Sequence, residues 1–222
     1  MSGGVPARHV VVRPSVLYVG TPAYLIATRN PDGSANLAAA SSYWALGRML
    51  VLGIEAEGQT ILNLLRDGEL TVSFPSGELW TAVARIAYLT GRDPVPDAKR
   101  ARYRHEPDKF AAAGLTPQRS DLVAPPRVLE CALQFEARVR RATPSLDGDY
   151  YMVEAEAVRV HADPDILQPG TEHIDPTRWD PLVYSFRHFF RRGAELGWLP
   201  SSPTALRPPS LGPGVQDAPP IS

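Results

Sequence analysis

Residues 30–75 read NPDGSANLAAASSYWALGRMLVLGIEAEGQTILNLLRDGELTVSFP, and their order predicts a β-rich fold together with a binding site. Asp32-Gly33 predicts a hairpin turn, because glycine adopts positive φ without steric cost. Small residues and hydroxyls follow, then a β-run, then a short segment with helical spacing. This order presents backbone N–H groups, hydroxyls and a helix N-terminus to a ligand that is flat and anionic at one end.

Strands and short helices are expected around this turn. VLYVGTPAYLIATRN is rich in β-branched and aromatic residues, and Gly20 and Pro22 divide it into two strands or mark a bulge. Further strands are expected at residues 35–39, 49–54 and 70–74. A short helix is expected at residues 60–68, with Thr60 as its N-cap and Gly68 as its stop, and a second helix begins at a capping Ser76.

Two long β-runs dominate the second half of the chain. VLECALQFEARVRRA and DYYMVEAEAVRVHA are separated by a turn at Asp147-Gly148. Leu129, Cys131, Leu133 and Phe135 alternate with polar residues, which is typical of half-buried antiparallel strands. The polar stretch before them indicates a solvated segment with one short helix pinned by Phe110 and Leu115. Repeated βαβ units and a glycine-rich loop are missing from the sequence, so a Rossmann sheet is not predicted.

Composition bounds the class of protein. The chain has 222 residues, 44% of them apolar, and a formal net charge of -1, which indicates one substantial core and argues against binding to nucleic acid or membrane. The N-terminus lacks a signal-peptide layout, so a cytoplasmic protein is expected. The single cysteine, Cys131, excludes an internal disulfide and is expected to be buried and inert, and no spacing of ligands predicts a metal site. One domain is expected at residues 1–199, followed by a proline-rich tail at 200–222 that is disordered or surface-wrapped.

The order of several blocks carries a family resemblance. DGSANLAAASSY, VLGI, QTILNL, GELTVSFPSGEL, DKFAAAGLTP, PPRVLECALQFEARV, GDYYMV and DPLVYSFRHFF follow one another between about Val11 and Phe190. This succession resembles the flavin reductase-like, FMN-binding split-barrel family of the flavoredoxin type. The resemblance implies a mainly β fold with short helices, a six-stranded antiparallel split barrel, a homodimer, and non-covalent FMN near the dimer interface, with FAD as the alternative flavin.

The resemblance also assigns the cofactor-binding residues. The strand that lines the isoalloxazine corresponds to Asn36, Leu37, Ala38 and Ala39, and the loop that approaches the ribityl chain and phosphate corresponds to Ser41, Ser42 and Tyr43. Thr60 and Asn63 match a Thr-x-x-Asn helix start that would favour a phosphate, and Gln59 stands where the family often has Lys or Arg. The residues alone leave other readings open: Thr60 as only an N-cap, Asn36 as a turn residue, and Ser41-Ser42 as an ordinary loop.

Two further segments bear on activity. GDYYMVEAE aligns with a Gly-Asp-His motif that meets the nicotinamide in many flavin reductases, and Tyr150 replaces that histidine, which weakens the case for NADH. The closing stretch IDPTRWDPLVYSFRHFFRRG resembles the family segment near the flavin. Tyr184, Arg187 and His188 are therefore the catalytic candidates on the substrate side. The alternative is that Tyr184 and Phe186 only dock a terminal helix.

The expected function is an FMN-dependent oxidoreductase of the flavin reductase type, with NAD(P)H as reductant and a partner monooxygenase as one destination of the reduced flavin. Three alternatives remain open from the sequence. The first is an FMN-dependent enzyme that acts on a bound organic small molecule without being a general flavin reductase. The others are a non-catalytic flavin- or haem-binding protein and a cofactor-free structural barrel.

Overall fold

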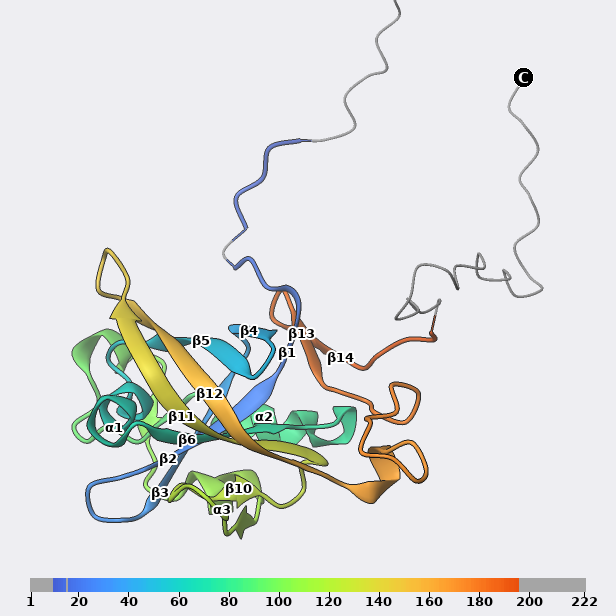
Figure 1. Ribbon diagram of the computed structural model, residues 1–222. Coiled ribbons are helices and arrows are strands. Elements are labelled where there is room, and N and C mark those ends of the chain that lie inside the picture. Colours follow the sequence, from blue (N-terminus) through green and yellow to red (C-terminus); the bar gives the residue numbers. More distant parts are fainter. Residues whose placement is uncertain (1–9, 15, 196–222) are drawn as a thin grey trace, which may run out of the picture. The chain divides into compact units, whose positions relative to one another are not determined.

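The computed structural model describes residues 10–14 and 16–195 (Figure 1). The chain divides into two units, Met1–Arg192 and Gly193–Ser222, and the predicted tail at 200–222 lies outside the described residues. The strands are β1 (Val19–Pro22), β2 (Tyr24–Arg29), β3 (Ala35–Ala40), β4 (Tyr43–Leu46), β5 (Met49–Glu55), β6 (Glu69–Phe74), β7 (Leu89–Thr90), β8 (Arg104–His105), β9 (Pro117–Gln118), β10 (Arg127–Val128), β11 (Leu133–Pro144), β12 (Tyr150–Ala162), β13 (Val183–Ser185) and β14 (His188–Phe190). The helices are α1 (Gln59–Asp67), α2 (Trp80–Ile86) and α3 (Lys109–Ala113), with short 3-10 turns η1 (Gly77–Leu79), η2 (Asp97–Lys99) and η3 (Pro164–Ile166).

The main sheet has seven strands in the order β3-β2-β6-β11-β12-β5-β4, and the expected count of six is not confirmed. At one end of this order, β4 folds back onto β5 through a tight turn at Gly47, a residue with φ of 59°. Tyr24 of β2 and Tyr43 of β4 lie near opposite ends of this strand order, yet their ring centroids are 5.9 Å apart. The sheet therefore curls on itself and encloses a core.

Both faces of β2 are buried, and its alternate residues belong to two different hydrophobic clusters. Tyr24 and Ile26 pack inside the curled sheet with Leu52, Val72 and other residues of β5, β6 and β12. Leu25 and Ala27 pack on the opposite face against residues from α2 and α3. This period of two is the geometry of a strand that lies between two layers, here the barrel interior and a helical cover.

Most of the predicted turns and helices are confirmed. Asp32-Gly33 joins β2 to β3, with Gly33 at φ of 87°, and the long β11–β12 hairpin (yellow in Figure 1) turns beside Gly148. Gly68 ends α1 in the left-handed conformation, as glycine does without a steric penalty. Phe110 and Leu115 are buried at α3, so they attach that helix to the fold as expected.

The two predicted side-chain caps are wrong. α1 begins after Gly58, one residue earlier than expected, so Thr60 lies inside the first turn and its hydroxyl accepts a hydrogen bond from Asn36. Ser76 precedes η1 and makes no cap bond through its side chain. In both places the sequence pattern located the helix start correctly to within a few residues, and at Thr60 a tertiary contact with Asn36 replaces the expected cap.

Two predicted elements also differ in the structure. Leu129 and Cys131 do not belong to a long strand, because β10 ends at Val128 and β11 begins only at Leu133, with a turn between them. Cys131 is nevertheless buried, and burial raises the pKa of its thiol, in agreement with the inert role expected. The C-terminal segment forms the β13–β14 hairpin against β1 where a terminal helix was considered, because residues 183–185 pair both with β1 and with residues 188–190.

Across the described ranges, none of the helices has both the length and the apolar composition needed to span a membrane.

Candidate functional site

A cleft of about 300 Å³ opens where the end of β3 and the start of α1 face the segment from α2 to α3. Seven of the residues singled out in the sequence line it: Ala38, Ala39, Ser41, Ser42, Gln59, Thr60 and Tyr184. One wall is thus made of small side chains and hydroxyls, and a tyrosine and Phe189 from the β13–β14 hairpin close one side. Because the side chains of this wall are small, a planar ligand can approach the backbone closely.

Four of the residues predicted to bind the cofactor do not line the cleft. Leu37 is fully buried in the cluster beneath α2 and α3. Tyr43 points into the barrel interior, where it meets Phe74 at a centroid distance of 5.4 Å. Asn36 and Asn63 are each 1% exposed and form the polar layer below the cleft floor. Asn36 and Asn63 therefore support the residues that line the cleft, and they do not face the cleft themselves.

This polar layer connects β2, β3 and α1. The Asn36 amide donates to the hydroxyls of Thr28 and Thr60, at 3.1 and 3.0 Å. Asn63 donates to the same Thr28 hydroxyl at 3.0 Å and accepts from the amide of Gln59 at 2.8 Å. Thr60 Oγ1 is thus an acceptor for Asn36, which leaves its own proton to donate toward the cleft.

The start of α1 is open to an anion. Gly58 is the N-cap and has no side chain to satisfy the N–H groups of the first turn, and no acidic residue occupies that turn. Gly58, Gln59 and Thr60 all line the cleft. Unpaired N–H groups and the positive end of the helix dipole favour a negative group at this position.

Gly91 lies on the side of the cleft that faces Asn36 and Gln59. A Cβ at this position would lie 2.7 Å from the Asn36 Oδ1 atom and 3.2 Å from the Gln59 Cβ. The Asn36 Oδ1 atom is buried and has no hydrogen-bond partner among the described residues. Only glycine allows β7 and the start of α1 to approach this closely, so Gly91 sets the width of the cleft.

Lys109 is one of several cleft residues that sequence reasoning missed, and it is the one with the most unusual surroundings. It is 3% exposed, lines the cleft, and forms no hydrogen bond or ion pair with any described residue. Burial, together with the charge of Lys99, lowers the pKa of Lys109 to about 8. The polar residues around Lys109 indicated a solvated segment. In the structure, the Asp108 carboxylate accepts a hydrogen bond from the Ala111 N–H and so caps α3, and Lys109 then lies next to the buried Phe110. Lys109 directly precedes Phe110, which was expected to be buried, and this position in the sequence was the available signal that the lysine is buried too.

The other two catalytic candidates lie outside the cleft. Arg187 and His188 line a neighbouring groove of about 640 Å³ with Trp80 and Phe190. Phe189 borders both the groove and the cleft, so the two spaces adjoin. Of the three candidates, only Tyr184 faces the cleft itself, where its ring packs against Phe189 at 5.4 Å and Tyr18 at 5.6 Å.

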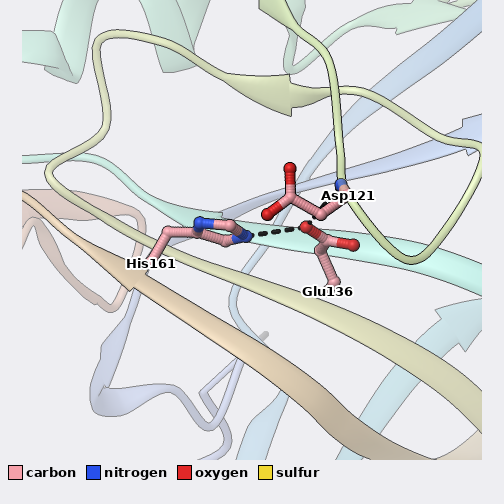
Figure 2. Close-up of side chains that lie close together, drawn as sticks. All are labelled: Asp121, Glu136 and His161. Carbon is pink, nitrogen blue, oxygen red and sulfur yellow. Dashed lines mark hydrogen bonds and ion pairs between the residues drawn. The ribbon is translucent and has the colours of Figure 1, made fainter.

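Three titratable residues that are far apart in the sequence, Asp121, Glu136 and His161, form a cluster that does not line the cleft. Figure 2 shows the side chains of Asp121, Glu136 and His161 close together, with the imidazole Nε2 of His161 2.7 Å from a carboxylate oxygen of Glu136. One ligand atom from each of the three lies within 4.8 Å of the others, which is close enough to consider a metal ion. The carboxylate of Glu136 already accepts three backbone N–H bonds, and Asp121 is paired with Arg159 at 2.7 Å. With Arg127 also 3.9 Å away, the surroundings are cationic and disfavour a further cation.

The cluster is instead a clasp that holds a loop. Glu136 is fully buried on β11, and its carboxylate receives the N–H groups of residues 121–123. Burial alone would raise the pKa of Glu136, but the bonds from Asp121, Leu122 and His161 outweigh burial and lower that pKa. The sequence could not indicate this cluster, because the register of β11 and β12 brings Glu136 close to His161, and the loop bonds to Glu136 bring Asp121 to them.

Comparison with known proteins identifies the family of this chain. The family model for the flavin reductase like domain matches residues 16–193, so the chain belongs to the flavin reductase-like family. The chain is also 38% identical over 192 residues to the uncharacterized protein YdfE of Bacillus subtilis (strain 168), a match that covers 86% of this chain and 92% of that one.

Solved structures show the same fold at lower identity. Flavoredoxin of Desulfovibrio vulgaris (Miyazaki F) superposes with a TM-score of 0.73 at 20% identity, covering 88% of this chain and 98% of that one. A split-barrel protein of Shewanella frigidimarina NCIMB 400, described as a flavin reductase, gives 0.67 at 22% identity, covering 82% and 87%. Nitrilotriacetate monooxygenase component B from Bacillus cereus gives 0.66 at 18% identity, covering 83% and 89%. The fold is therefore a split β-barrel with short helical additions.

Proposed function

We propose that this protein is an FMN-binding oxidoreductase that passes hydride from NAD(P)H to flavin in the cytoplasm. The observation that carries the proposal is one cleft with a wall of small residues and, facing it, a buried unpaired lysine beside an open helix start. A flavin mononucleotide has the same division into a flat ring and one dianionic end. When bound, the flavin would supply the hydride-accepting ring.

The residues present fit that group. Lys109, the hydroxyl of Thr60 and the first N–H groups of α1 would hold the phosphate, and they replace the basic residue that the family often has at Gln59. The backbone of Ala38 and Ala39, with Tyr184 and Phe189 across the cleft, would orient the ring and exclude water. FMN is favoured over FAD as the resident flavin. Lys109, Thr60 and the start of α1 form a single group of phosphate donors, and FMN has a single phosphate.

The proposal is tested first on purified protein. A yellow protein with absorbance near ~450 nm, or tight quenching of added FMN fluorescence, supports flavin binding. A colourless protein with no affinity for FMN or FAD contradicts it. Stopped-flow mixing of the loaded protein with NADH and with NADPH then measures bleaching of the flavin by each reductant.

The hydroxyl of Thr60 gives a local test of phosphate binding. Thr60→Val keeps the shape but removes both the donor toward the cleft and the acceptor for the Asn36 amide, and we expect FMN affinity to fall by about 2 kcal/mol, the contribution of a hydrogen bond to a charged group. Thr60→Ser is the matched control and is expected to bind FMN nearly as the native protein does. Equal FMN affinity in Thr60→Val and the native protein, measured by fluorescence titration, would place the phosphate elsewhere.

A second function is favoured by two observations. Tyr150 is 48% exposed where many flavin reductases have the histidine that meets nicotinamide, and the groove beside Phe189 adjoins the cleft. Both features suit an enzyme that uses its flavin on a bound organic molecule without supplying a partner monooxygenase. Slow bleaching by NADH and NADPH, with rapid oxidation of chemically reduced protein by an aromatic acceptor, would favour this second function.

We also propose that the protein is a homodimer. Trp44, Leu46, Tyr150 and Met152 are exposed on β4 and β12, and the strand register places them on one face with Met49 and Val51 of β5. The same face carries Glu55, Glu154 and Glu156, each of which is paired with a cation. Tyr150 lies opposite Glu55, a cleft residue, so this face borders the cleft. Exposed aromatic and aliphatic side chains gathered on one face and bordered by charged residues are typical of an interface.

Charge placed on that face tests the dimer. Trp44→Glu with Met152→Glu is expected to convert a dimer into a monomer, because two desolvated carboxylates would face their copies. Light scattering after size exclusion measures the mass. Leu129→Glu, at an exposed leucine outside β4, β5 and β12, is the control and is expected to remain dimeric. A native protein that is monomeric at ~50 μM contradicts the proposal.

A further inference from the structure

The groove beside the cleft combines open aromatic rings with cationic side chains. It is lined mostly by residues of η1, the start of α2 and the β13–β14 hairpin (Figure 1). Trp80 is 49% exposed and Phe190 is 52% exposed, although both belong to the groove wall. Large rings left open in a hollow give a planar ligand flat apolar surface to contact.

Arg191, one of the two arginines of the groove, is already bound by carboxylates. Its guanidinium donates to Asp180 at 2.7 Å and to Glu78 at 2.7 Å. Its side chain lies against Gly77, where a Cβ would come within 2.5 Å of the Arg191 Cγ. Glycine at this position therefore makes room for Arg191, whose charge is balanced within the fold.

Arg187 is the other arginine, and its charge is available to a ligand. Within residues 10–14 and 16–195, its guanidinium forms no hydrogen bond or ion pair, and it lines the groove. A planar guanidinium binds a carboxylate through two parallel N–H···O bonds. A single guanidinium balances the charge of one carboxylate, whereas a phosphate monoester carries about two negative charges. The groove therefore suits a flat ring that carries a carboxylate.

The backbone that carries Arg187 is strained. Ser185 pairs with His188, so Phe186 and Arg187 are the central residues of a two-residue hairpin turn, with φ of 44° and 71°. Such turns favour Asn-Gly, because a side chain with a Cβ is disfavoured at positive φ. Among the described residues, no other non-glycine residue has positive φ. Strain of this kind is concentrated where a side chain has a function, which here is the cation at the groove.

The groove meets the cleft at Phe189, which lines both spaces. Its ring packs against Tyr184 of the cleft at a centroid distance of 5.4 Å and against Trp80 of the groove at 6.4 Å. A ligand in the groove would therefore lie next to a ligand in the cleft.

We propose that the groove binds a planar aromatic carboxylate, with Arg187 holding the carboxylate and with Trp80 and Phe190 contacting the ring. This inference rests on the second function proposed above, and it names the substrate class of an enzyme that uses its flavin on a bound organic molecule. Binding of the acid to the groove does not itself require flavin, so the two can be measured separately.

The experiment is calorimetric titration of the full chain with 2-naphthoate and with naphthalene-2-carboxamide, a neutral probe of the same shape. We expect the native protein to bind the carboxylate at least ~10-fold more tightly than the amide, because only the carboxylate forms charge-assisted bonds to a guanidinium. Arg187→Ala should weaken naphthoate by at least ~10-fold and leave the amide unchanged. Trp80→Ala should weaken both probes about equally. Arg119→Ala, at an exposed arginine that lines neither space, is the control and should bind both probes as the native protein does.

A variant of the turn separates binding from folding. Phe186→Asn/Arg187→Gly installs the residue pair that such a turn prefers, so we expect a higher urea midpoint than that of the native protein. The same variant should lose naphthoate as Arg187→Ala does, because the guanidinium is gone. Native naphthoate affinity in this variant overturns the proposal.

Three other results also overturn the proposal. They are equal affinity of the native protein for the two probes, an Arg187→Ala protein that binds naphthoate as the native protein does, and loss of naphthoate binding at saturating FMN, which would place the acid in the cleft. A native dimer that becomes monomeric in Arg187→Ala, measured by light scattering, assigns the groove to a second copy and overturns it as well. FMN titration of the same samples is independent. FMN binding without naphthoate binding overturns the groove proposal alone, and naphthoate binding without FMN binding overturns the proposed function alone.

Discussion

Replacing Lys109 by methionine is expected to stabilise the empty protein. The lysine is 3% exposed, and its pKa is lowered to about 8 chiefly by burial. The unfolded chain therefore binds more protons than the folded one between pH 8 and 10.5, and the stability of the native protein rises with pH across that window. Below pH 8 the full penalty of burying the charge is present, on the order of 3 kcal/mol from the difference between the two pKa values.

Lys109→Met removes this penalty and its pH dependence. At pH 7 the variant is expected to gain roughly 2 to 3 kcal/mol in urea unfolding, with a flat profile between pH 8 and 10.5. Lys99→Met is the matched control among the two lysines of the chain. Because Lys99 is paired with Glu55, its loss is expected to give no such gain. Stability of Lys109→Met equal to that of the native protein at pH 7 would contradict the argument.

The same substitution is expected to weaken FMN by at least ~10-fold, since the buried charge is the proposed phosphate partner. In the native protein, FMN affinity should decrease as the pH rises above about 8, because the free lysine loses its proton there. In Lys109→Met the affinity should no longer vary across that range. A stabilised variant with native FMN affinity would separate the two effects and assign the phosphate to the α1 start alone.

The fold was largely predictable, because its signals are local. Alternation along residues 133–139 and 150–157, and glycines at Gly33, Gly68 and Gly148, locate strands and turns through backbone chemistry. The C-terminal hairpin was not predicted, since it depends on pairing with β1, more than 150 residues earlier in the chain. Long-range pairing of short strands leaves little trace in sequence periodicity.

The site was predictable only on one wall. Ser41, Ser42 and Thr60 lie in the stretch of residues 30–75, and the structure brings them to the cleft. Asn36 and Asn63 share the same motif but support the cleft from below, a distinction that depends on side-chain direction. The facing wall contains Lys99 and Lys109. The many charges in their segment predict an exposed loop, and only the structure shows that the buried Phe110 and Leu115 hold it against the fold.

Glu136→Ala is expected to be a strongly destabilising change outside the cleft. The buried carboxylate accepts hydrogen bonds from residues 121–123 and from His161, and it lies 3.9 Å from Arg127. Removing it leaves those donors and the buried Nε of Arg127 without their charged partner, which costs on the order of 3 to 5 kcal/mol. Glu154→Ala, at an exposed pair with Arg141, is the control and is expected to cost less than about 1 kcal/mol.

Acid unfolding gives this clasp a second readout. The pKa of Glu136 is lowered in the folded protein, so its contribution is present above the pKa of an unfolded glutamate and is lost as the pH falls through the folded value. Glu136→Ala should therefore lose stability at pH 7 and show a shallower decline below about pH 4.5 than the native protein. Its FMN affinity should be unchanged while it is folded, because none of the clasp residues lines the cleft. A Glu136→Ala protein as stable as the native one at pH 7 would show that the loop at 121–123 is held by other contacts.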